Sequence, residues 1–180
     1  MAATMVGALG RLFDIGCGIS PVNLNTGANT GKRISMQGAK GITFVVFAGV
    51  GTAASDLAVD LQEHTAYTGG TTADLDIITK YYIKDELALD NDETWALVTQ
   101  TAGSEISDTG GAGTSAEHEQ IVVIEVTADQ LSDGYTHISL DVPQPGATKL
   151  GCVLYILWGL YAQRIPSNLP NLLRPGAANA

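Results

Sequence analysis

The chain has 180 residues and a formal net charge of −10, with 45% hydrophobic and 16% charged residues. A chain of this length is expected to form one domain with a self-sufficient core, and it is too apolar to be a disordered acidic tail. Its nine basic residues face nineteen acidic ones. This balance argues against nonspecific nucleic-acid binding, because such binding neutralises phosphates with lysine and arginine.

The few basic residues are concentrated at the two ends of the chain. Residues 1–40 hold four of them against Asp14 alone, and residues 149–180 hold three against no acid. Residues 41–148 hold two lysines against eighteen carboxylates. Basic ends on an acidic body suit a subunit whose ends lie on the acidic faces of its neighbours, since opposite potentials steer association. The alternative interpretation is a solvated acidic face with ends that are basic by chance.

The cysteines and the chain start indicate the compartment. Cys17 and Cys152 lie in apolar surroundings, which favours buried free thiols, with one bridge between them as the alternative. Residues 1–5 lack the basic and apolar regions of a secretory signal, so synthesis in the cytoplasm is expected. The longest apolar run, residues 150–162, is shorter than the roughly 20 residues of a membrane-spanning helix, and no membrane partner is expected.

Short β-branched and aromatic runs between turn-forming clusters predict an all-β domain. The main strands are expected at residues 42–48, 57–64, 77–84, 95–100, 121–127, 135–142 and 150–160, and weaker ones at 12–15, 33–36 and 105–106. So many strands in one domain predict an antiparallel β-sandwich, and the long connections, such as residues 67–74, favour a jelly roll. One short helical turn is expected within residues 127–134.

Three of these strands contain segments that are apolar on both faces. They are residues 44–47, 121–124 and 153–157, whereas most other strands alternate between apolar and polar side chains. A strand with two apolar faces has no side that prefers water. These strands are therefore expected to be central in a sheet or to lie at a contact between subunits.

The chain is divided into an N-terminal arm with edge strands at residues 1–40, a sandwich body at 41–161 and an extended C-terminal arm at 162–180. The last part contains three prolines, which prevent a regular strand or helix. Both ends are expected to contact other subunits through basic or large apolar side chains. The predicted interface residues are Arg11, Lys32, Arg33, Lys149, Trp158, Arg164, Ile165, Leu169, Leu172, Leu173 and Arg174.

No motif in the sequence supports a cofactor or metal site. Residues 27–33 have the wrong glycine spacing for a phosphate-binding loop. Residues 110–113 do not lie between a strand and a helix, as the glycines of a dinucleotide-binding motif do. The three histidines are far apart in the sequence and show no metal-ligand spacing. Residues 90–93 could offer oxygen ligands to calcium, but they lack the glycine and the distal glutamate of a complete loop.

The sequence also lacks the usual signs of an enzyme. It has no Gly-x-Ser-x-Gly motif and no cysteine in a basic setting. Trp95 and Trp158 lie among aliphatic residues, where core packing is the ordinary explanation and a sugar-stacking platform the alternative. We therefore expect a protein that is not an enzyme and has no cofactor.

The second half of the chain resembles a group of tailed-bacteriophage head proteins that decorate or cement the capsid. The resemblance lies in the acidic strand at residues 116–126, the short loop at 131–134, the apolar strand at 150–157 and the proline-containing segment at 164–172. It implies a virion component, a homotrimer on the outer face of the shell, whose partner is the major capsid protein. The alternatives are a head–tail connector or tail subunit, and a non-catalytic sugar-binding module.

Overall fold

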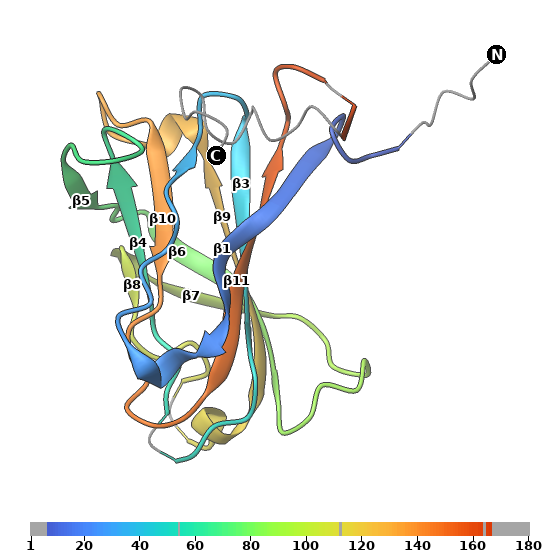
Figure 1. Ribbon diagram of the computed structural model, residues 1–180. Coiled ribbons are helices and arrows are strands. Elements are labelled where there is room, and N and C mark those ends of the chain that lie inside the picture. Colours follow the sequence, from blue (N-terminus) through green and yellow to red (C-terminus); the bar gives the residue numbers. More distant parts are fainter. Residues whose placement is uncertain (1–6, 54, 112, 164, 167–180) are drawn as a thin grey trace.

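The computed structural model describes residues 7–166 except 54, 112 and 164. In this part of the chain two antiparallel β-sheets pack face to face, as the sequence predicted (Figure 1). Helical structure is limited to three 3-10 turns, and none of these described helices is long and apolar enough to cross a membrane. Most of the predicted C-terminal arm lies outside the described residues.

The larger sheet has six strands in the order β1-β11-β3-β9-β6-β7. Their bounds are Phe13–Asn23 for β1, Leu150–Trp158 for β11, Gly41–Ala48 for β3, Glu119–Thr127 for β9, Ile78–Glu86 for β6 and Ala96–Gly103 for β7. The three strands that were predicted to be apolar on both faces are β11, β3 and β9, and they lie side by side in the interior of this sheet. This confirms the expectation that they are central.

The smaller sheet has the order β2-β10-β4-β5, and β8 pairs with β4 beside that path. The bounds are Ile34–Ser35 for β2, His137–Asp141 for β10, Val59–His64 for β4, Thr72–Asp74 for β5 and Glu105–Ile106 for β8. From β1 to β4, and again from β9 to β11, successive strands alternate between the two sheets. This alternation is compatible with a jelly roll, which stays a prediction.

The core fills the space between the two sheets. Each strand alternates its side chains between the two faces, so every second residue points inward. Phe44 and Ile124 from the large sheet and Leu61 and Leu140 from the small one are at most 1% exposed. These inward residues fix the register of each strand, because a shift of one residue would move them into water.

Two elements differ from the sequence prediction. β1 is much longer than residues 12–15, because it pairs along β11 from Phe13 to Asn23, with irregularities after Cys17 and Ile19. β5 lies within residues 67–74, which were expected to form only a loop. The predicted helical turn is confirmed as the 3-10 turn Ala128–Gln130.

Candidate interaction surface

One row of apolar side chains crosses the whole outer face of the large sheet. Successive register partners from β1 to β7 form this row, which we call the apolar belt: Cys17, Leu154, Val45, Val123, Tyr82 and Leu97. Their sequence neighbours on the four strands β11, β3, β9 and β6, such as Val122 and Val153, point into the core. The belt therefore presents apolar surface to solvent on strands whose other face is already buried.

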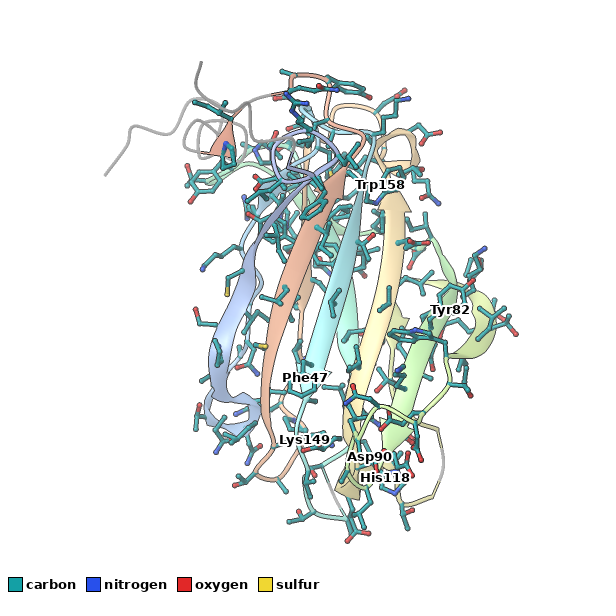
Figure 2. All side chains as sticks on the ribbon, turned by 90° about the vertical axis from the view of Figure 1, so that its right-hand side faces the viewer. Phe47, Tyr82, Asp90, His118, Lys149 and Trp158 are labelled. Atoms are coloured by element: carbon teal, nitrogen blue, oxygen red, sulfur yellow. The ribbon has the colours of Figure 1, made fainter. Side chains whose placement is uncertain are left out.

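Neighbouring rows widen the belt on both sides. Phe47 lies opposite both Cys152 and Ile121, and Ile15 lies opposite Ile156. Figure 2 looks onto this face and shows Phe47 and Tyr82 on its strands. Phe47 is 43% exposed. Each half-exposed large side chain exposes roughly 100 Å², so the face offers on the order of 600 Å² of apolar surface. This area is at the upper end of the range for the largest apolar patch on a typical monomer.

An open apolar groove of about 280 Å³ lies at the β6 side of the belt, lined by Tyr82, Trp95 and Val123. Trp95 is half exposed, at 50%, although it directly precedes β7. The ammonium of Lys84 lies 5.4 Å from the centre of the Trp95 ring, within the range of a cation–π contact. A large aromatic side chain in an open groove is typical of the anchoring points of protein interfaces.

An acidic cluster lies beside this groove, in the segment that joins β6 to β7. This segment projects away from the sandwich in Figure 1, and Figure 2 labels Asp90 within it. Carboxylate oxygens of Glu86, Asp92 and Glu93 lie within 4.8 Å of one another. A hydrogen bond to Asp90 and repulsion from its charge raise the pKa of Asp92. Such exposed groups are common without an ion, so we assign no metal here; the cluster is a concentration of negative charge.

Nine of the eleven predicted interface residues fall into three groups. Arg11, Lys32 and Ile165 are exposed. Trp158 is half-buried at the end of β11, where its ring packs over Gly41 and its Nε1 donates a hydrogen bond to Thr43. The remaining arm residues lie outside the described part of the chain; they are Arg164, Leu169, Leu172, Leu173 and Arg174.

The structure contradicts the interface role predicted for Lys149. Its side chain is fully buried, and its Nζ donates hydrogen bonds to the carbonyl oxygens of Ala116, at 2.9 Å, and His118, at 3.1 Å. Burial lowers the pKa of this lysine. The Lys149 ammonium therefore acts inside the fold. It satisfies two carbonyl groups of the turn that immediately precedes β9.

Arg33 is also engaged within its own chain. It is half-buried, and its guanidinium donates hydrogen bonds to the carbonyls of Ala66 and Gly69 and to the hydroxyl of Thr72. These bonds hold the connection between β4 and β5 against β2. Its partners are more than thirty residues away in the sequence, so no local pattern could indicate this role.

A buried polar cluster on the outer face of the small sheet was not predicted. His64 on β4 and Ser139 on β10 lie 2.9 Å apart between Nε2 and the hydroxyl oxygen, and Nδ1 of His64 lies 2.9 Å from the hydroxyl of Thr72. The carboxylate of Asp141 accepts hydrogen bonds from Ser139 and from the amide of Gly31. Strand alternation was the available signal, since Ser139 and Asp141 share one face.

This cluster has the residue types of a catalytic triad but not its arrangement. In a triad the carboxylate orients the histidine, whereas here it accepts from the serine. Ser139 is 1% exposed and His64 4%, so a substrate cannot reach the hydroxyl. The cluster is instead a network in which buried polar atoms satisfy one another.

Both cysteines are free thiols, as expected, but they are half-buried on the outer face of the large sheet and not buried as the sequence predicted. Comparisons of the chain with protein-family models, with curated proteins and with solved structures found no match. Its function is therefore inferred from its own residues, above all from the apolar belt.

Proposed function

We propose that this chain is a structural virion protein that binds the outside of a phage capsid and stabilises the shell. The observation that carries the proposal is the apolar belt, which spans all six strands of the large sheet. Its sequence resembles that of capsid decoration proteins, for which binding to a protein lattice is the whole function. A subunit of this kind needs a rigid body with a large contact surface and no reacting group.

Burial of this surface by a partner would favour assembly. Covering about 600 Å² of apolar surface contributes roughly 15 kcal/mol before the costs of association are subtracted. The area is comparable with the roughly 800 Å² that each partner contributes to a standard interface. Because the belt lies on a packed sheet, little ordering is needed when a partner covers it.

The charge distribution supports contacts between like subunits or with a shell. Arg11 and Lys32 are exposed in the N-terminal part, whereas the acidic cluster beside β6 is exposed on the body. Opposite charges on different parts of one molecule favour staggered contacts between copies over face-to-face contacts of equal charge. Such contacts would spread over a lattice and hold neighbouring subunits together.

The test measures binding to phage heads that lack the protein. We expect Phe47→Thr combined with Leu97→Lys to bind heads at least about tenfold more weakly, since both side chains are exposed and threonine keeps the preference for a strand. The matched control is Leu12→Thr, because Leu12 is exposed but precedes β1. Deletion of residues 163–180 should also abolish binding. Full occupancy by the belt variant would overturn the proposal, and a ring of subunits at one vertex would favour a connector.

A sugar-binding module is the second candidate, favoured by the groove at Tyr82 and Trp95. Exposed aromatic rings stack on the apolar faces of sugars, and Trp95 offers such a ring. A glycan array probed with the whole chain tests this candidate. Saturable binding that Trp95→Ala removes would support it over the capsid role.

A further inference from the structure

The groove beside β6 and the C-terminal end of the chain are complementary in polarity and charge. We propose that residues 167–180 of one copy dock in the groove at Tyr82 and Trp95 of a second copy, with Arg174 at the acidic cluster of Glu86, Asp92 and Glu93. This inference rests on the proposed function in one respect, namely that copies lie side by side on a shell. It assigns a definite occupant to the groove at the β6 side of the belt.

The apolar part of the match lies in leucines and prolines. Leu169, Leu172 and Leu173 are large aliphatic residues, and Pro170 and Pro175 lie on either side of Leu172 and Leu173. Aromatic grooves bind proline-containing extended segments well, because such segments are already restricted in the unbound state and lose little entropy. The groove is lined by Tyr82, Trp95 and Val123 and so offers aromatic and aliphatic surface alone.

The electrostatic part of the match lies next to the groove. Residues 167–180 contain one basic residue, Arg174, and no acidic residue. On the groove side, the Lys84 ammonium lies 3.7 Å from a Glu93 carboxylate, so one cation faces the three carboxylates of the cluster. An arginine brought to this cluster would reduce the repulsion among its carboxylates.

The length and the starting point of the segment favour exchange between copies. After β11 the chain passes the end of the sandwich, where the amide of Tyr161 donates a hydrogen bond to the carbonyl of Gly38. Trp158 and Asp90 lie toward opposite ends of the face in Figure 2. Within one molecule the segment would have to turn back and cross β11, β3 and β9 to reach Trp95. Its fourteen residues can extend to roughly 45 Å from Pro166, so the segment can reach well away from its own sandwich.

The experiment uses the full chain with Trp158→Phe, so that Trp95 is the only tryptophan. Sedimentation measures self-association, and the emission wavelength of Trp95 reports whether the groove is covered. We expect Leu172→Asp with Leu173→Asp to raise the dissociation constant at least about tenfold and to shift the emission to longer wavelength. The matched control, Asn168→Asp with Asn171→Asp, adds the same charge without removing apolar contacts and should have a much smaller effect.

A charge exchange tests the second contact. Arg174→Glu and Glu93→Arg should each weaken association several-fold, and the two together should restore part of it, as a double-mutant cycle requires of residues in contact. Additive losses would overturn the placement of Arg174. Self-association that the leucine variants leave unchanged would overturn the docking, and so would a monomer whose own segment shields Trp95.

Head binding separates this inference from the proposed function. If the segment of one copy docks on another copy in solution but the protein does not bind heads, the capsid role is overturned and the docking proposal stands. Full head binding by a chain that shows no exchange either in solution or on the head would overturn the docking alone.

Discussion

Nε2 of His64 lies 2.9 Å from the hydroxyl oxygen of Ser139, across the pairing of β4 with β10. Both side chains are buried although they point away from the core between the sheets. Burial, together with the charge of Arg33 and the neighbouring His137, lowers the pKa of His64 to about 4. The imidazole is therefore neutral in the folded protein at neutral pH.

His64 should make the stability of the protein depend on pH. Its folded pKa lies below the usual value of 6.5, so the unfolded chain binds a proton first as the pH falls. The contribution of neutral His64 to the free energy of unfolding is complete above pH 6.5. It is lost as the pH falls toward 4, and the loss amounts to about 3 kcal/mol. Denaturant unfolding from pH 7.5 to 4 should show the advantage of the natural chain over His64→Gln declining across this range.

The comparison with His64→Gln isolates this effect from those of buried acids. Burial raises the pKa of Asp60 and of Asp141, so these carboxyl groups change stability with the opposite sign as the pH falls. Both are present in the natural chain and in the variant. A difference in unfolding free energy that stays constant between pH 7.5 and 4 would show that His64 does not titrate as described.

Lys149 should be needed for folding and not for assembly. Lys149→Ala leaves a cavity and removes the donor from the carbonyls of Ala116 and His118, and we expect a loss of about 2–4 kcal/mol in the free energy of unfolding. Lys149→Met keeps most of the volume and loses the hydrogen bonds and the charge without leaving a large cavity, so it should cost less. Thermal and denaturant unfolding measure both, and a variant that folds normally but fails to assemble would restore Lys149 to an interface role.

Gly31 should tolerate no side chain. A Cβ there would press on the backbone carbonyl of Leu140, which is fixed within β10, and the amide of Gly31 donates to Asp141 at 2.8 Å. We expect Gly31→Ala to lower the free energy of unfolding by at least about 2 kcal/mol. Gly27→Ala is the matched control, because a Cβ there meets no neighbour and the backbone is extended. Equal unfolding free energies for the two variants would contradict this explanation.

Arg33 should hold the connection between β4 and β5 in place. Arg33→Ala removes the donor to the carbonyls of Ala66 and Gly69, and amide hydrogen exchange in residues 65–72 should accelerate. The rates in the large sheet should stay as they are. Lys32→Ala is the control, since Lys32 is exposed and adjacent in sequence. Equal acceleration in both variants would mean that the guanidinium does not order this segment.

The sequence predicted the layers of the fold better than the length of individual strands. The apolar segments at residues 44–47, 121–124 and 153–157 could be assigned to the middle of a sheet. Their side chains are apolar on both faces, so neither face of these strands prefers water. β1 could not be recognised in full, because Gly16, Gly18 and Pro21 interrupt the alternation of its side chains. The strand forms by pairing with β11, which is distant in the sequence. β5 consists of only Thr72–Asp74 and forms by pairing with β4.

The candidate surface was predictable only in part. Sequence reasoning assigned contacts to the ends of the chain, and it gave a contact between subunits as the alternative to a central position for the apolar strands. The belt as a continuous surface depends on register, for example on Val45 lying opposite both Leu154 and Val123. Register between distant strands is set by packing of the whole sandwich, so no local pattern shows which side chains become neighbours.

Hydroxyl-radical footprinting of the chain, free and bound to heads, shows which face of the molecule other proteins cover. Tyr82, Trp95 and Leu97 are exposed in the described structure, and we expect each to be labelled several-fold more slowly in the bound state. Leu12, which is exposed outside the belt, serves as the reference. Protection of the belt residues relative to Leu12 is the predicted result. Unchanged labelling of all three on fully occupied heads would contradict the assignment of the large sheet's outer face as the surface of assembly.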